Sequence, residues 1–238
     1  MSDIDWLAWD SDVLGIKVAR LTAAQYSTEQ LRLLLTELAH QGAKLVYWAS
    51  ASDCQRSQQA ATELKGFLAD RKVTYLCRLT DLKQAMDFSH MIETYQSELP
   101  EPGLVELAYL SGLYSRFRTD KKISQAQFEK VYRIWITNSV NKQIADKVLT
   151  IRDHHHLAGM ITLGCKQGRG DIGLLAIHPS YQGRKMGAAL VTAAQAYFAQ
   201  HYQWSQVVTQ EANRPACRLY EHCGYHPEKI ENFYHFWL

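Results

Sequence analysis

Hydrophobic and polar positions in the first eighty residues alternate between a helical and a strand period. Four leucines recur at helical spacing, namely Leu31, Leu34, Leu35 and Leu38. Ser27, followed three residues later by Gln30, is typical of a capping box at a helix N-terminus. The pattern therefore predicts a helix over 28–40 that ends at Gly42.

The remaining segments of this region predict a small α/β arrangement. We expect turn and strand over 6–21, strands over 44–49 and 73–79, and a helix over 58–64 that ends at Gly66. In both halves of the chain, a strand is followed by a helix that ends in glycine and an aromatic residue, at 66–67 and 224–225. Either the first half is a degenerate copy of the second, or this pair is only a common helix stop.

The pattern changes in the middle of the chain. Mixed helix and loop begin around 81–84, and Pro100-Glu-Pro-Gly103 is the strongest interruption. We place a domain boundary between about 80 and 104, and expect an N-terminal accessory α/β domain over 1–85 and a second domain over 86–238. The second domain should contain, in order, helices over 104–114 and 125–137, strands over 147–152, 157–163 and 171–177, a helix of about 15 residues, a strand over 206–210, a helix over 215–222 and a strand over 232–237.

Composition narrows the class of protein. Hydrophobic residues make up 47% and charged residues 21% of 238 residues, which is enough apolar material for a core. A net charge of +2 is too small for broad attraction to nucleic acid or membranes. The first ten residues lack a basic region and an apolar run, and no segment approaches the roughly 18 apolar residues of a membrane helix. We expect a cytoplasmic protein with no nucleic-acid partner and no membrane insertion.

Cysteine and histidine give little reason to expect a metal site. The five cysteines form no C-x-x-C pair, so we interpret them as reduced thiols, and Cys217 and Cys223 as small buried apolar residues. The run His154–His156 beside Asp153 is either a metal site or a polar hairpin turn, and we favour the turn.

A strand, a glycine-containing turn and a helix follow one another around 171–190. Gly183 and Gly187 let an anion approach the backbone closely, while Arg184 and Lys185 add positive charge. The first-turn amides of the helix have no partner within it, and the helix dipole adds positive character. The stretch suits a diphosphate, although such a turn can equally be an ordinary connection.

This stretch and a later one resemble motifs of the Gcn5-related N-acetyltransferase (GNAT) superfamily. Gln182-Gly-Arg-Lys-Met-Gly187 looks like the acyl-CoA signature Q/R-x-x-G-x-G/A. Lys185 departs from that signature, because it replaces the earlier glycine and makes the turn less permissive. A second motif of the family, N-x-x-A-x-x-L-Y-x-x-x-G-F/Y, is matched by Asn213, Ala216, Leu219, Tyr220, Gly224 and Tyr225.

The resemblance implies an α/β GNAT fold with a splayed mixed sheet and acetyl-CoA as cosubstrate. The strand at 175–177 should diverge from the strand near 207–210, the cofactor should lie in the gap, and its pyrophosphate should meet the amides of 182–188. The cofactor-binding residues that the resemblance implies are Leu175, Ala176, Ile177, Gln182, Gly183, Arg184, Lys185, Met186, Gly187, Ala188 and Asn213.

Tyr220 matches the tyrosine that the family commonly places beside the thioester sulfur. A neutral amine would attack the thioester carbonyl, a backbone amide of the splayed strand would stabilise the oxyanion, and Tyr220 would donate a proton to the leaving thiolate. Without the motif, Tyr220 would be interpreted as a core residue of an amphipathic helix. Three residues are alternatives for the base that deprotonates the amine, namely His178, Glu211 and His222.

A narrower resemblance concerns the acceptor. Four segments look like the dTDP-fucosamine acetyltransferases, namely 9–15, 114–118, 132–136 and 233–237. Those enzymes carry an extra N-terminal domain and acetylate the 4-amino group of a dTDP-linked 4-amino-4,6-dideoxygalactose for surface polysaccharide synthesis. Arg116 and Arg118 would then bind the diphosphate of the nucleotide sugar, the alternative being a solvated basic loop.

Aromatic residues offer further alternatives. Tyr114, Phe117 and Trp135 would suit stacking on sugar or thymine, although such spacing is usual for core residues, and we interpret Trp135 as core. Aromatic residues near the C-terminus, if exposed, would suit a homodimer interface. The rival functions are acetylation of a protein N-terminus or of a small amine such as a polyamine, and acyl-CoA binding without catalysis.

Overall fold

The computed structural model describes residues 3–80 and 91–238. The change of pattern expected at 81–84 lies outside the described residues. Two compact units divide the chain: the first comprises Met1–Val73, Ser115–Phe128 and Lys229–Leu238, and the second Thr74–Tyr114 and Glu129–Glu228. Both units are discontinuous, whereas the expected domains over 1–85 and 86–238 were continuous; that division stays a prediction.

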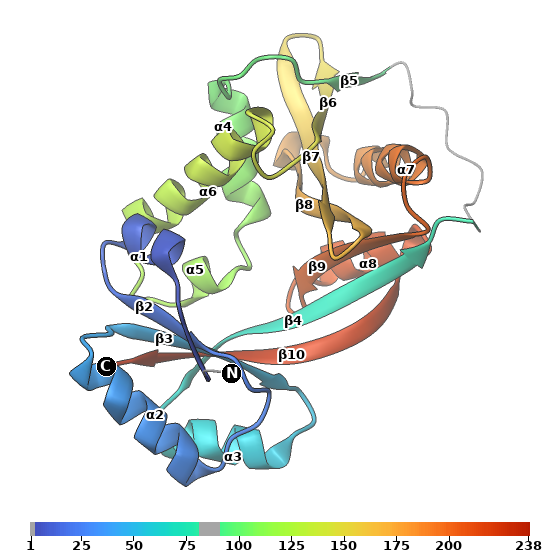
Figure 1. The fold of residues 1–238 in the computed structure, drawn as a ribbon. Coiled ribbons are helices and arrows are strands. Elements are labelled where there is room, and N and C mark those ends of the chain that lie inside the picture. Colours follow the sequence, from blue (N-terminus) through green and yellow to red (C-terminus); the bar gives the residue numbers. More distant parts are fainter. Residues whose placement is uncertain (1–2, 81–90) are drawn as a thin grey trace. The chain divides into compact units, whose positions relative to one another are not determined.

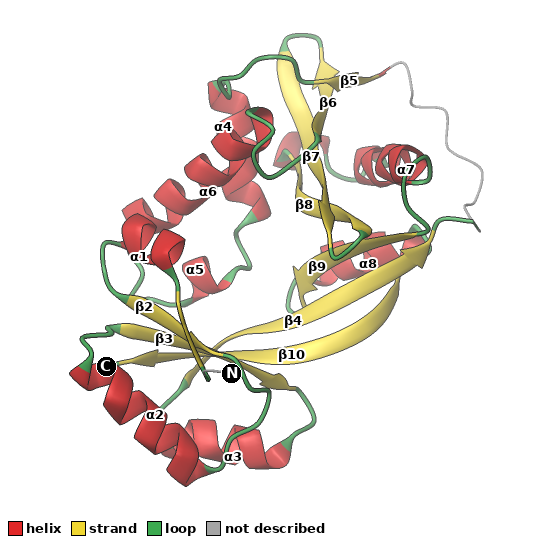
Figure 2. Ribbon diagram, viewed as in Figure 1, coloured by secondary structure: helices red, strands yellow, loops and turns green. Residues whose placement is uncertain are grey.

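The first unit is a sheet of β1, β2, β3, β10 and the first part of β4, with two helices on one face. Its strand order is β1-β2-β3-β10-β4, and of the pairs β1–β2, β2–β3 and β3–β10 only β2–β3 is parallel. Figure 2 shows α2 and α3 on the same side of these strands. The elements are β1 (Ile4–Trp6), α1 (Ala8–Leu14), β2 (Val18–Leu21), α2 (Thr28–His40), β3 (Leu45–Ala51), α3 (Gln55–Glu63), α5 (Arg116–Thr119), and parts of β4 (Phe67–Arg78) and β10 (His226–Trp237).

The predicted helix over 28–40 is confirmed at both ends. The Ser27 hydroxyl accepts a hydrogen bond from the Gln30 amide, and the Gln30 side chain accepts one from the Ser27 amide, which completes the capping box. Leu31, Leu35 and Leu38 are buried in a core that also includes Trp48 and Phe236.

The segment 6–21 was predicted as turn and strand, and this was wrong for its middle. Residues 8–14 form helix α1, which ends at Gly15 in the left-handed conformation with φ of 70°. Only Val13 and Leu14 of this helix are buried. Two neighbouring buried residues cannot display a helical period, so the hydrophobic pattern carried no signal for α1.

A buried hydrogen-bonded cluster occupies the opposite face of β3 and β10 in the first unit. Asp120 accepts hydrogen bonds from His235 Nδ1 at 2.7 Å, Trp237 Nε1 at 2.8 Å and the Lys122 amide at 2.9 Å. Burial, opposed by the hydrogen bond to Asp120, lowers the pKa of His235. Burial raises the pKa of Asp120, but the bonds from His235, Lys122 and Trp237 outweigh it and leave that pKa lowered.

These shifts predict acid sensitivity. Below its usual pKa of about 6.5, His235 binds a proton in the unfolded chain but resists it in the folded one. The free energy of unfolding should therefore fall between pH 7 and 5.5, by up to about 1.4 kcal/mol per pH unit from this residue. Denaturant titrations at several pH values should show that the free energy of unfolding falls less steeply with pH in His235→Gln than in wild type. Equal slopes in wild type and His235→Gln would contradict the prediction.

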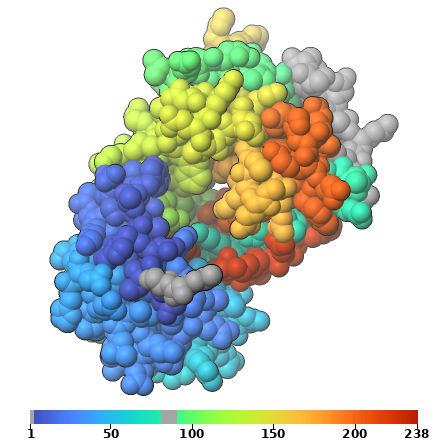
Figure 3. Space-filling view, in the orientation of Figure 1, coloured from blue at the N-terminus to red at the C-terminus, as the bar shows by residue number. Residues whose placement is uncertain are grey.

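The second unit contains the strand order β9-β8-β7-β6-β5. Figure 1 shows α4 and α7 on opposite sides of β7 and β8, and the space-filling view shows α7 (orange) packed beside these strands (Figure 3). Its elements are β5 (Ile92–Thr94), α4 (Pro102–Ser111), α6 (Gln125–Val140, which begins in the first unit), β6 (Lys147–Asp153), β7 (His156–Lys166), β8 (Arg169–Ile177), η2 (Pro179–Tyr181), α7 (Met186–Phe198), β9 (Trp204–Gln210) and α8 (Arg214–His222).

The expected helices and strands of the second half are all present, with ends shifted by a few residues. The strand expected over 73–79 begins earlier, at Phe67, and the final strand begins at His226. The short edge strand β5 was not predicted, because three residues are too few to show alternation. No helix of the described residues is long and apolar enough to cross a membrane.

Candidate active site

A gap between two parallel strands of the second unit provides the site. The pairing of β8 with β9 runs from Gly170–Ser205 to Ile172–Val207 and stops there, although β8 continues to Ile177 and β9 to Gln210. The predicted divergence of 175–177 from the strand near 207–210 is therefore confirmed.

A groove of about 620 Å³ adjoins this splay within the second unit. Its wall consists of β8, the glycine-rich turn, the start of α7, the start of α8 and the end of α4. Ten of the eleven residues predicted to bind the cofactor line it: Leu175, Ala176, Ile177, Gln182, Gly183, Lys185, Met186, Gly187, Ala188 and Asn213. Arg184 is the exception, since its guanidinium lies 5.2 Å from the Tyr181 ring centre and 3.9 Å from Asp153.

The glycine-rich turn presents free amides at the groove. Gly183 adopts a φ of 78° and Lys185 a φ of 62°, both in the left-handed region. Helix α7 starts at Met186, and its first internal hydrogen bond reaches Lys185 from the Ala189 amide. The amides of Met186, Gly187 and Ala188 thus have no partner within the helix, which makes them donors for an anion such as a pyrophosphate. The residues present therefore fit acetyl-CoA.

Lys185 occupies the position at which the motif carries glycine. Its backbone adopts the left-handed conformation, which is strained for a residue that has a Cβ atom. Lys185→Gly should relieve this strain while the backbone amide remains, so the Kd for acetyl-CoA should stay within about threefold of wild type. Lys185→Ala keeps the strain and loses the ammonium, so calorimetric titration of both variants separates the two effects. A loss above tenfold in both would show that the ammonium binds the anion.

Asn213 is the N-cap residue of α8, and Tyr220 lies within that helix. The Asn213 side chain accepts a hydrogen bond from the Ala216 amide at 3.3 Å and so caps the helix, while the residue also lines the groove. Tyr220 is 4% exposed and does not line the groove. Its ring contacts those of Tyr75 and Tyr225, with centroids 6.1 and 5.9 Å away. Burial strongly raises the pKa of Tyr220, so its phenol stays protonated at neutral pH.

The alternatives for the base do not converge on the groove. His178 follows β8 and lies with Nε2 3.8 Å from Glu106, Glu211 follows β9, and His222 is exposed on α8. None of the three lines the groove. Asp171, which the sequence did not single out, has its pKa raised by burial despite a hydrogen bond from Gln206 Nε2 at 2.8 Å. It does not line the groove either, so no base is assigned.

The two predicted diphosphate ligands lie in the first unit. Arg116 contacts Asp10 at 3.4 Å and lies over the rings of Tyr47, Phe117 and Phe233. Arg118 donates to the Gln125 side chain. Both arginines are thus held by neighbours, and their role as diphosphate ligands stays a prediction.

The three aromatic residues considered for stacking on sugar or thymine differ in their exposure. Tyr114 is 41% exposed and lines the groove, whereas Phe117 is buried beneath Arg116. Trp135 is half-buried and stacks on Tyr132. Near the C-terminus, Phe233, Tyr234 and Phe236 are buried, so they do not form the exposed patch that would suit a homodimer.

The polar turn also has the expected form. His154 lies at the turn between β6 and β7 with a left-handed φ of 53°. Among residues 3–80 and 91–238, no three His, Cys, Asp or Glu side chains are grouped so as to hold a metal ion. The described cysteines are free thiols; Cys217 is buried as expected, while Cys223 is only partly buried and its pKa is raised to about 11 by burial.

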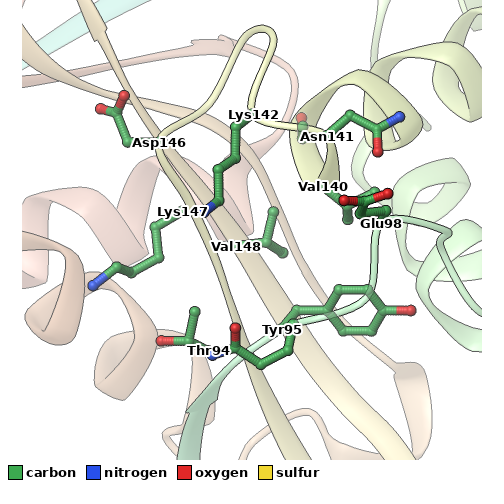
Figure 4. Close-up of a pocket in the computed structure, with 11 residues that line it drawn as sticks. Thr94, Tyr95, Glu98, Val140, Asn141, Lys142, Asp146, Lys147 and Val148 are labelled. Carbon is green, nitrogen blue, oxygen red and sulfur yellow. The ribbon is translucent and has the colours of Figure 1, made fainter.

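A second pocket of about 410 Å³ lies at the other edge of this sheet, beside β5 and β6 (Figure 4). Lys142 extends across the view, while Lys147 points away toward Tyr197, whose ring its ammonium approaches at 4.6 Å. The pocket lining has no net charge, because its two lysines are balanced by two acidic residues, Glu98 and Asp146. It shares no residue with the groove, so we place the candidate active site at the splay.

Comparison with known proteins agrees with this geometry. Residues 145–227 match the model of the acetyltransferase (GNAT) domain, and they contain the splay, the glycine-rich turn and α8. This segment has the sequence of a GNAT acetyltransferase domain as that family model describes it. Members of that family use acetyl-CoA as the acetyl donor.

Other comparisons extend beyond the GNAT domain. The chain is 25% identical over 143 residues to the spore coat polysaccharide biosynthesis protein SpsD of Bacillus subtilis (strain 168); the match covers 58% of this chain and about half, 49%, of that relative. The fold resembles a GCN5-related N-acetyltransferase from Sphaerobacter thermophilus, with a TM-score of 0.65, 16% identity, and coverage of 98% of this chain and 76% of that one. It also resembles a tandem GNAT protein from the clavulanic acid biosynthesis pathway, with a TM-score of 0.58, 13% identity, and coverage of 94% and 76%.

Proposed function

We propose that this protein is an acetyl-CoA-dependent N-acetyltransferase that acetylates the 4-amino group of a dTDP-linked 4-amino-4,6-dideoxy sugar for surface polysaccharide synthesis. One observation supports acetyl transfer as the reaction. The pairing of β8 with β9 ends at Ile172–Val207, beside the groove that the glycine-rich turn lines. A thioester there would meet unpaired strand amides, and a pyrophosphate would meet the start of α7.

The proposed reaction needs one bond to form and one to break. The neutral acceptor nitrogen attacks the acetyl carbonyl carbon, the carbon–nitrogen bond forms, the carbon–sulfur bond breaks, and the sulfur leaves as thiolate. The nitrogen gives up one proton to a base, directly or through water, and the Tyr220 phenol donates one to the thiolate. A strand amide stabilises the negative charge on the carbonyl oxygen.

The proposed acceptor rests on three observations. SpsD, a polysaccharide biosynthesis protein by name, is similar over 58% of the chain. Segments in both units resemble the dTDP-fucosamine acetyltransferases. The turn after α4 supplies Leu113 and Tyr114, 46% and 41% exposed, to the groove wall, which suits the carbon face of a sugar ring. Such a reaction would take place in the cytoplasm.

Thiol release from acetyl-CoA by the purified protein tests the proposal. The acceptor panel contains dTDP-4-amino-4,6-dideoxygalactose, its glucose epimer, spermidine and a peptide with a free N-terminus. Turnover confined to a dTDP-amino sugar is the expected result. Turnover on the peptide or on spermidine alone would overturn the acceptor and keep the reaction, whereas acetyl-CoA binding without turnover would favour a non-catalytic regulator.

A further inference from the structure

The pairing between β7 and β8 contains an irregularity at the splay. Leu163 pairs with Ile172 and Ile161 pairs with Leu175, so Gly173 and Leu174 both lie opposite the single residue Thr162. This two-against-one arrangement is a β-bulge. It begins directly after Ile172, the last residue of β8 that pairs with β9. The extra residue therefore lies at the point where β8 and β9 separate beside the groove.

The side chain of Thr162 fills this bulge. Its hydroxyl oxygen accepts a hydrogen bond from the Leu174 amide at 2.8 Å, and the residue is 2% exposed. A Cβ added to Gly173 would come within 2.8 Å of the same oxygen, so the threonine hydroxyl also explains why glycine occupies that position. A side-chain oxygen thus satisfies an amide that the bulge would otherwise leave without its ladder partner.

This bond determines where the next amides point. The Leu174 amide is directed toward β7, and so is the His178 amide, which donates to the Ala158 carbonyl at 2.8 Å. Successive amides of a strand point to opposite edges. The amides of Leu175 and Ile177 therefore point to the other edge, from which β9 has diverged, and both residues line the groove.

We propose that Thr162 is a positioning residue, whose hydroxyl holds the bulge so that the Leu175 amide faces the acetyl carbonyl oxygen. The inference rests on the proposed acetyl transfer at this groove. As the acceptor nitrogen bonds to the carbonyl carbon and the sulfur departs, the carbonyl oxygen becomes negatively charged. This oxygen accepts a hydrogen bond from the Leu175 amide. Thr162 itself touches no reacting atom; it acts through the backbone of β8.

The chain offers matched variants for this test. Thr162→Val keeps the shape and removes the acceptor, while Thr162→Ser keeps the hydroxyl. Thr150→Val is the control, since Thr150 is also buried, on the neighbouring strand β6, and its hydroxyl has no hydrogen-bond partner among the described residues. We expect Thr162→Val to lower kcat by 10- to 100-fold with the KM for acetyl-CoA within about threefold of wild type. Thr162→Ser and Thr150→Val should both stay within about threefold in kcat.

A second readout does not depend on turnover. Amide hydrogen exchange, followed by NMR, should show a protected Leu174 amide and a Leu175 amide that acetyl-CoA protects. Thr162→Val should remove both effects, and Thr162→Ser should restore them. If wild type binds acetyl-CoA without turnover, the proposed reaction fails while exchange still decides the role of Thr162. An unchanged kcat and unchanged exchange in Thr162→Val, or an equal loss in Thr150→Val, would overturn the proposal.

Discussion

Replacing Asp120 by alanine should lower the free energy of unfolding by about 3 kcal/mol. The carboxylate is 3% exposed and accepts hydrogen bonds from His235, from Trp237 and from the Lys122 amide. Alanine would leave three donors without an acceptor, two of them on side chains of β10, and an unpaired buried donor costs about 1–3 kcal/mol. For a protein of this size the melting temperature should fall by roughly 6–12 °C.

The control for this substitution is another aspartate of the same unit. Asp5 contacts Arg20 at 2.6 Å, but the two side chains are 45% and 50% exposed. A solvent-exposed ion pair contributes little, so Asp5→Ala should change the free energy of unfolding by less than about 1 kcal/mol. Denaturant titrations at pH 7 measure both variants. Similar small losses would show that the hydrogen bonds of Asp120 do not stabilise the unit.

This cluster was not predictable from the sequence. Asp120 stands in the sequence between Arg118 and Lys121, among charged residues, and 115 residues separate it from His235. Periodicity reports which residues face a core, but it does not report which polar residues of distant segments meet there. For the same reason, the sequence does not show that Arg116 contacts aromatic rings from three separate elements, β3, α5 and β10.

Local signals, in contrast, were sufficient for most helices and strands and for the groove. The capping box at Ser27 predicted the start of α2, and the strand expected over 171–177 ends as predicted at Ile177. The two family motifs lie in turns and helix starts, where the backbone and not distant packing determines the geometry. Ten of the eleven residues that the resemblance implied therefore line one groove, whereas the bulge at Thr162 depends on the register between two strands, which the sequence does not display.

Replacing Tyr220 by phenylalanine should reduce kcat by about 10²-fold, the low end of the effect of an acid–base group. The substitution removes one hydroxyl and keeps the ring that packs between Tyr75 and Tyr225. Because Tyr220 does not line the groove, the KM for acetyl-CoA should stay within about threefold. Steady-state thiol release with the accepted amine measures both constants.

Tyr225 provides the matched control for Tyr220. It is fully buried in the same aromatic group, and its hydroxyl forms a 2.6 Å hydrogen bond with Ser205. Tyr225→Phe should cost about 1 kcal/mol of stability, because Ser205 loses its partner, but kcat should be unchanged. A fall of kcat in both variants would indicate that the aromatic group acts through packing.

The origin of the proton can also be tested. Burial keeps the Tyr220 phenol protonated far above neutral pH, so the group is available as a donor across the working range. If it protonates the departing sulfur, the defect of Tyr220→Phe should shrink with an acyl donor whose thiol is more acidic than coenzyme A, because a better leaving group needs less help. A defect of the same size with both donors, or no defect at all, would remove Tyr220 from the chemical step and leave it as a core residue of α8.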